Sequence, residues 1–188
     1  GDAADWSPVE VEYRDTAGDT FHRDYPGYGG LEYKNTSGRN DIVTAKVAVY
    51  GDRLCFLAQT STPLTPHTGN NWMLLLIDAD QDQATGWEGY DYLVNKNLPS
   101  DKTTTLMRYA PDSAGGPWVE EAQLDYAYTG KSLELAIPRG LIGLEGDALT
   151  FDFHWSDNPA DLKDVISLCL NGDSAPNRRF NFRFVWGK

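Results

Sequence analysis

The sequence predicts an all-β protein, a single antiparallel β-sandwich with at most a few short helices. Three observations predict this fold class. Apolar and polar residues alternate with a period of two in at least six segments. Turn sequences such as YGDR, YTGKS and LEGD separate these segments. No segment with helical periodicity alternates with the strands, which argues against a parallel α/β sheet.

The expected strands are distributed along the whole chain. Alternation marks VEVEY (9–13), TAKVAVY (44–50), RLCFLA (53–58), SLELAI (132–137), LTFDFHW (149–155) and RRFNFRFVW (178–186). The apolar run LLLID (74–78) and the returning GYDYLV (89–94) predict a hairpin. Only PRGLIGL (138–144) and PADLKDVISL (159–168) could be helical, and both are short.

We expect residues 1–188 to form one domain, because that length is typical of a single core. Residues 1–40 are expected to form an N-terminal strand and a Gly- and Tyr-rich loop packed on the sandwich. The apolar share of 40% is sufficient for a sizeable core. Cys55 and Cys169 lie in apolar surroundings, which favours buried free thiols and leaves a disulfide as the alternative.

The net charge of −12 argues against a nucleic acid or an anionic membrane as partner, since both require clustered Lys and Arg. No stretch approaches the ~20 apolar residues of a membrane span. The chain opens without a leader peptide, so we expect either a cytosolic protein or a mature secreted one. Acidic composition is compatible with secretion and with divalent cations.

Three aspartates occupy alternate positions in the turn DADQD (78–82), which begins at the last residue of LLLID. Ca²⁺ prefers about six to eight oxygen ligands, and its charge offsets the repulsion between neighbouring carboxylates. The loop is not an EF-hand, because its sixth position is Gln83 and its twelfth is Gly89. The pattern predicts a structural Ca²⁺ in a β-hairpin. The predicted ligands are Asp78, Asp80, Asp82, Glu88 and Asp91.

The alternative for this loop is a solvated acidic turn whose aspartates hydrogen-bond their own backbone. A second acidic loop, YRDTAGDTFHRDYPGYGG, has Asp15, Asp19 and Asp24 among its glycines. It is a weaker metal candidate, and turn formation explains its residues equally well.

Four stretches together resemble the family 9 carbohydrate-binding modules and their wider DOMON-like superfamily of β-sandwiches. They are NDIVTAKVAVYGDRLCFLAQTSTPL (40–64), NWMLLLIDADQDQATGWEGYDYLVN (71–95), KSLELAIPRGLIGL (131–144) and LTFDFHWSDN (149–158). The resemblance covers about Ile42 to Asn158. Its most specific parts are the turn from Asp78 to Gly86 and the sequence LELAIP.

The resemblance implies a non-catalytic module that stacks sugars on tryptophans and is braced by calcium. The chain departs from the family at the sugar-contacting positions. The positions of the family's acidic and basic sugar contacts in the two central strands fall at about Leu74 and Leu93. The position of the family's second stacking tryptophan falls in DSAPNRR (173–179), which has no aromatic residue. A polar binding position of the late strand is matched by His154.

Strand parity gives a second route to binding residues. The aromatic residues of 149–155 and 178–186 are expected to point inward, and these include Phe180, Trp155 and Trp186. The polar residues that alternate with them then point outward. Such a mixed polar patch suits sugar hydroxyls, and its arginine could take a uronate carboxylate bidentately. The alternative is an ordinary sheet face with ion pairs. The patch consists of Asp152, His154, Asn181 and Arg183.

Exposed aromatic rings are the expected stacking platforms, because an aromatic face packs against the C–H face of a sugar. Trp72 follows TGNN, and Trp87 lies in TGWEGY with Tyr90 beside it. These three are the candidates, although packing in the core is the commoner role of any single tryptophan.

The expected function is therefore carbohydrate binding without turnover, by a calcium-braced module that targets a parent polysaccharide-active enzyme to a polysaccharide or oligosaccharide. We expect a monomeric module, secreted by a bacterium or held at its surface and joined to the parent catalytic domain. A catalytic β-sandwich glycosidase or lyase and a structural spacer without ligand are the alternatives. The chain has no G-x-S-x-G, H-E-x-x-H or C-x-x-C motif, and its 28 acidic residues make carboxylate pairs unspecific.

Overall fold

The computed structural model describes residues 3–20, 23–67 and 71–187 and confirms the all-β fold class. The strands are β1 (Tyr13–Arg14), β2 (Arg23–Pro26), β3 (Glu32–Asn35), β4 (Ile42–Tyr50), β5 (Arg53–Thr60), β6 (Leu74–Asp78), β7 (Tyr92–Val94), β8 (Thr103–Tyr109), β9 (Trp118–Thr129), β10 (Ser132–Pro138), β11 (Leu149–Asp157), β12 (Asp173–Ala175) and β13 (Phe182–Trp186). The short 3-10 helices are η1 (Ala3–Trp6), η2 (Tyr28–Gly30), η3 (Arg139–Ile142) and η4 (Val165–Cys169). No helix in these three ranges is long and apolar enough to cross a membrane.

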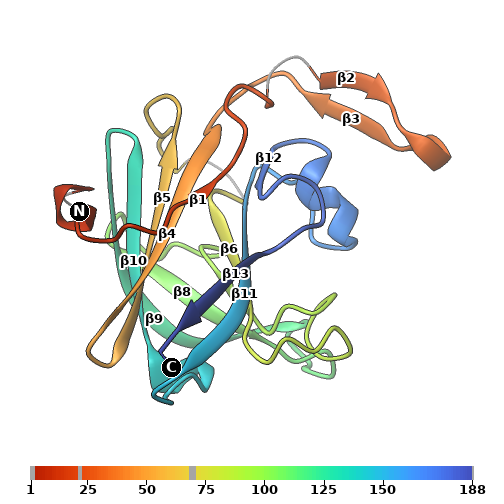
Figure 1. Ribbon diagram of the computed structural model, residues 1–188. Helices are drawn as coiled ribbons and strands as arrows, with labels where there is room; N and C mark the ends of the chain where they lie inside the picture. The colour runs from red at the N-terminus through yellow and green to blue at the C-terminus, as the bar shows by residue number, and fades with distance from the viewer. Residues whose placement is uncertain (1–2, 21–22, 68–70, 188) are drawn as a thin grey trace.

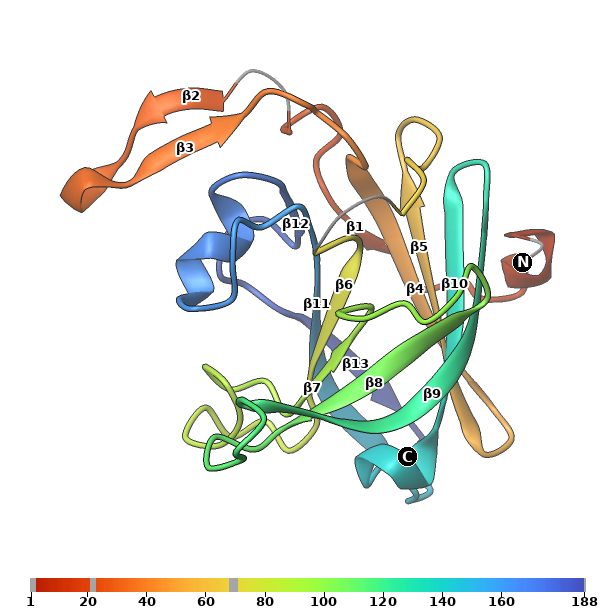
Figure 2. The same ribbon diagram turned by 180° about the vertical axis from the view of Figure 1, so that it is seen from behind.

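Eleven strands form one antiparallel sheet that folds over on itself, in the order β1-β4-β5-β10-β9-β8-β7-β6-β11-β12 with β13 also paired to β11. The long strand β9 joins the two layers. Its residues 118–125 pair with β8, and its residues 126–129 pair with β10. The hairpin β2–β3 is a separate two-stranded sheet that projects from the sandwich, as Figures 1 and 2 show.

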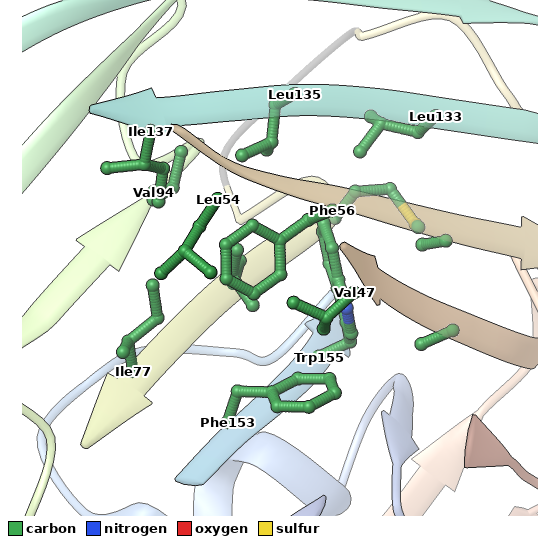
Figure 3. Packing of buried hydrophobic residues seen from close by; sticks show 14 of the residues in the cluster. Val47, Leu54, Phe56, Ile77, Val94, Leu133, Leu135, Ile137, Phe153 and Trp155 are labelled. Atoms are coloured by element: carbon green, nitrogen blue, oxygen red, sulfur yellow. The ribbon is translucent and has the colours of Figure 1, made fainter. Parts of the chain in front are cut away.

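The main core lies between the two layers, and the alternation of apolar residues builds it. On β10, Leu135 and Ile137 point inward opposite Phe56 and Leu54 of β5. Figure 3 shows these side chains converging with Phe153 from β11, whose ring lies 6.0 Å from the ring of Phe56. Truncating such a buried phenylalanine to alanine costs about 3–5 kcal/mol.

Strand β6 is buried on both faces, which explains its continuous apolar sequence. Leu75 and Ile77 belong to the main core, whereas Leu74 and Leu76 belong to a second apolar cluster on the opposite face. The second cluster consists of Leu74, Leu76, Trp87, Tyr90, Leu93, Met107, Trp118, Val165 and Leu168. Loop 79–91 and η4 therefore supply side chains that cover the outer face of this layer.

Two strand predictions are wrong at the ends of the chain. Residues 9–12 form no strand, and Val11 is 61% exposed. Phe180 was expected in the core but is 70% exposed, because β13 begins only at Phe182 and the preceding loop passes through Arg178 with a φ of 69°. Trp186 is also exposed and packs under the guanidinium of Arg139, whereas Trp155 is buried as predicted.

Candidate functional site

The turn after β6 brings three of the predicted metal ligands together. Asp78, Asp80 and Asp91 each place one carboxylate oxygen within 4.8 Å of the others. Asp78 is buried at the end of β6, Asp91 is half-buried and Asp80 is exposed. Backbone amides orient two of them: Gln81 N donates to Asp78 Oδ1 at 2.6 Å, and Ala79 N donates to Asp91 Oδ2 at 2.9 Å.

These carboxylates repel one another in a partly desolvated place. Burial, with smaller contributions from the charges of Asp91, Asp152 and Asp80, raises the pKa of Asp78 to about 6. Burial also raises the pKa of Asp91, with a smaller contribution from Asp80. Three convergent hard oxygens that destabilise each other fit a cation such as Ca²⁺, whose charge would offset the repulsion.

Asp82 and Glu88 are not brought into this cluster, contrary to prediction. The backbone passes through Gln81 in the left-handed region (φ 60°), so Asp80 and Asp82 do not continue the alternation of a strand. The Oδ1 of Asp82 instead accepts a hydrogen bond from Ala84 N at 2.9 Å. Glu88 is exposed and is not part of the carboxylate cluster.

The three predicted stacking platforms are buried, so the prediction that they are exposed is wrong. Trp72 is 0% exposed and donates from Nε1 to the carbonyl of Thr65 at 3.0 Å. Trp87 and Tyr90 are 8% and 3% exposed and pack in the second apolar cluster. The outer face of β6 is apolar, and the rings of Trp87 and Tyr90 cover it.

The face that the resemblance assigns to sugar contacts is also closed. Leu74, Leu93 and His154 are each 0% exposed. His154 was expected to point outward into solvent, but loops cover it, and its Nδ1 lies 2.9 Å from the carbonyl oxygen of Phe180. Burial lowers the pKa of His154 to about 4, so the ring is neutral near pH 7. A ligand cannot reach these three side chains in this structure.

The rest of the predicted polar patch is occupied by internal contacts. Strands β11 and β13 pair as expected, with Asp152 opposite Arg183. Arg183 donates from Nε and Nη2 to the two carboxylate oxygens of Asp152 at 2.8 and 2.9 Å. Asn181 is exposed and accepts a hydrogen bond from Tyr90 Oη at 2.6 Å. The Asp152–Arg183 pair therefore matches the alternative interpretation, a sheet face with an ion pair.

A groove of about 770 Å³ lies on the outer face of the other layer, over β4, β5, β10 and β9. Its floor is built of small residues: Ala48, Cys55 and Ala136 face one another in one row across three adjacent strands. Trp6, Val9 and Tyr50 line it as well. The N-terminal segment therefore forms part of its wall, and the volume is within the usual range for small ligands, about 300–1,000 Å³.

Acidic groups but no basic side chain line this groove in the described chain: Asp5, Asp125 and Glu134. The Oε1 of Glu134 is buried and has no hydrogen-bond partner among the described residues. Tyr50 is 78% exposed and offers both a ring and a hydroxyl. Cys55 and Cys169 are both free thiols, as favoured, but only Cys169 is buried and Cys55 is half-buried. Burial, and less strongly the charge of Glu134, raises the pKa of Cys55 and keeps the thiol neutral.

The groove residues were not predicted from the sequence. The only signal for them is the strand alternation that buries Val47, Leu54 and Leu135. The small residue that follows each of these three in the sequence then points outward. Parity alone does not tell an open face from one covered by another segment.

Comparison of the chain with protein-family models, curated proteins and solved structures gives no significant match. The resemblance to family 9 modules therefore remains an expectation, and a functional proposal depends on the geometry of the chain itself.

Proposed function

We propose that the protein is a non-catalytic carbohydrate-binding module that takes a neutral glycan in the groove over β4, β5, β10 and β9. It acts outside the cell as an accessory domain of a polysaccharide-active enzyme. Asp78, Asp80 and Asp91 hold a structural Ca²⁺ in the β6–β7 hairpin, which belongs to the other layer.

The observation that supports this function most is the pairing of an apolar floor with carboxylate acceptors in one groove. A pyranose ring has a C–H face that packs on Ala48, Cys55 and Ala136 and a rim of hydroxyls that donate to Glu134 and Asp125. Glu134 is half-buried and lines the groove, and its carboxylate is the proposed acceptor for these hydroxyls. Three acidic residues disfavour an anionic ligand here, so the proposed glycan is neutral.

A glycan array of plant, algal and host polysaccharides, followed by calorimetric titration, tests the proposal. Glu134→Gln should weaken binding about tenfold or more, because hydrogen bonds to a charged acceptor contribute about 1.5–3 kcal/mol. Tyr50→Ala should weaken it as well, by removing the exposed ring at the groove. Tyr28→Ala is the matched control, since Tyr28 is a 96% exposed tyrosine on η2 and does not line the groove.

Product release is assayed in the same samples. Soluble oligosaccharide released from a bound polysaccharide would favour the glycosidase or lyase alternative. If no glycan binds the calcium-loaded protein, the spacer alternative is correct. Equal affinity of the wild type and Glu134→Gln for a bound glycan would place the binding site elsewhere.

A further inference from the structure

A second cluster of acidic side chains lies where the N-terminal segment meets β12. Asp15, Asp19 and Asp173 each place a carboxylate oxygen within 4.8 Å of the others. The first two belong to the acidic loop that the sequence marks as a weaker metal candidate. Asp24 of that loop is not part of the cluster, because it lies on β2 and pairs with Lys34 at 3.8 Å.

No lysine or arginine of the described ranges forms an ion pair with these three carboxylates. Asn177 Nδ2 donates to Asp15 Oδ1 at 3.0 Å and to Asp19 Oδ2 at 2.6 Å. The other oxygens, Asp15 Oδ2 and Asp19 Oδ1, are buried and accept no hydrogen bond from the described residues.

The third carboxylate, on Asp173, is 1% exposed, and its Oδ2 accepts a hydrogen bond from Ile42 N at 2.6 Å. Burial raises the pKa of Asp173 well above its usual range, and the charges of Asp19 and Asp15 raise it further. Convergent carboxylate oxygens that are buried without donors are the ligands that a hard divalent cation prefers.

A hollow of about 360 Å³ adjoins this cluster and shares Asp19 and Asn177 with it. Arg23 also lines the hollow and donates from Nη1 to the carbonyl of Cys169 at 3.1 Å. Its Nε and Nη2 are buried and have no acceptor among the described residues. Two unpaired N–H groups on one edge of a guanidinium match the two oxygens of a carboxylate.

The fold holds Arg23 in this place through the hairpin β2–β3. Lys34 N of β3 donates to the carbonyl of Leu170 at 3.0 Å, and Asn171 Nδ2 donates to the carbonyl of Lys34 at 3.1 Å. The hairpin is thereby attached to the chain just after η4, and Figure 1 shows it rising above β12 and that helix.

We propose that this hollow is a ligand site in which Asp15, Asp19 and Asp173 hold a divalent cation, and in which Arg23 and that cation together bind a carboxylate. A divalent cation leaves the three carboxylates with one net negative charge. Arg23 and the exposed Arg178 line the hollow, and their two positive charges favour a bound carboxylate. The hollow is separate from the groove, and its test does not depend on a neutral glycan binding there.

Metal content tests the cation. Atomic emission on calcium-dialysed protein should give one Ca²⁺ per chain fewer for Asp15→Asn/Asp19→Asn than for the wild type. The matched variant Asp78→Asn/Asp91→Asn should lose the Ca²⁺ of the β6–β7 hairpin instead. A protein that carries all four substitutions should therefore lose two Ca²⁺ per chain. Asparagine keeps the shape of each side chain and removes the repulsion, which protects the fold. Unchanged calcium content in a folded Asp15→Asn/Asp19→Asn protein would overturn the proposal.

Calorimetry with glucuronate, acetate and glucose tests the carboxylate. Glucuronate should bind in calcium, fail to bind in chelator, and bind about tenfold or more weakly to Arg23→Gln. Arg14→Gln, a change at an arginine whose side chain is 79% exposed, is the control and should leave binding unchanged. If acetate binds as tightly as glucuronate, the site recognises the carboxylate alone. If acetate binds more weakly, the site also recognises the sugar ring, and the ligand is an acidic sugar. Binding of neither acid, or equal binding of glucose and glucuronate, would overturn the proposal.

Discussion

Asp78 is a buried carboxylate next to two others, and the consequences depend on pH. Its pKa in the folded chain is about 6, mainly because of burial, whereas a free aspartate titrates near about 4. Between these values the folded metal-free protein binds a proton that the unfolded chain has lost. The stability provided by protonated Asp78 is therefore present below about pH 4 and is lost as the pH rises through 6.

Asp78→Asn imitates the protonated carboxyl and keeps an oxygen for the hydrogen bond from Gln81 N. In chelator at pH 7.5 we expect this variant to melt at or above the temperature of the wild type, and at pH 4 we expect the difference to vanish. In calcium the order should reverse, because only the wild type retains all three carboxylates. Thermal melts at both pH values, with and without calcium, provide the measurement. A variant less stable than the wild type in chelator at pH 7.5 would contradict this role.

Residue types alone predicted part of the candidate site. The carboxylates of Asp78, Asp80 and Asp91 come together within one β-hairpin, and contacts that are local in the sequence are what a sequence pattern reports best. The burial of Trp87 could not be read in the same way, because it depends on whether the outer face of β6 needs an apolar cover. The run LLLID contains that information, since a strand without alternation is buried on both faces. Trp72 is instead part of the main core.

The loop between β6 and β7 depends on Gly86. Its φ is 66°, and a Cβ atom there would lie 2.4 Å from the carbonyl oxygen of Tyr90. Two hydrogen bonds close this turn, Trp87 N to Tyr90 O at 2.8 Å and Tyr90 N to Trp87 O at 2.9 Å. The turn fixes the rings of Trp87 and Tyr90 on the sheet and places Asp91 next to Asp78.

Gly86→Ala should therefore destabilise the protein by more than backbone strain alone. The matched control is Gly143→Ala, with a similar φ of 71° and nothing within 4 Å of the added Cβ. The control should cost about 1–2 kcal/mol, the usual penalty of a left-handed alanine. Gly86→Ala should cost at least twice as much and weaken calcium binding. Urea unfolding of both variants measures the difference, and equal losses would contradict the proposed close packing.

Strand prediction succeeded where strands have neighbours on both sides. Alternation in β4, β5, β10 and β11 gave the buried face correctly, because a one-residue slip would expose a whole apolar row. It was wrong for VEVEY and for Phe180, at the two ends of the chain. There the backbone leaves the sheet, and an alternating sequence without a paired strand has no face to bury.

Calcium bound only by the folded chain stabilises the whole molecule by mass action. At a hundredfold excess over the dissociation constant the gain is about 2.7 kcal/mol for one site. For a chain of this length that corresponds to a melting temperature higher by about 5–10 °C. We expect chelation to lower the melting temperature by this amount and calcium to restore it. An identical melt in calcium and in chelator, with no metal in the native protein, would contradict the bracing role.

The two outer faces of the sandwich differ in what covers them. On the layer with β6, β7 and β8, Trp87, Tyr90 and η4 close the outer face, where the resemblance to family 9 modules led us to expect sugar contacts. On the layer with β4, β5 and β10, small residues leave a groove beside the N-terminal segment. The second face is therefore open to a ligand in this structure and the first is not.

Amide chemical-shift mapping with a bound neutral glycan is the most direct test of this account. The glycan selected on the array is titrated into isotopically labelled, calcium-loaded protein. We predict that the shifted amides cluster at Ala48, Cys55, Ala136 and Glu134, on the floor of the groove. Shifts centred on Trp87 and His154 instead, or no shifts with any glycan of the array, would contradict carbohydrate binding in the groove.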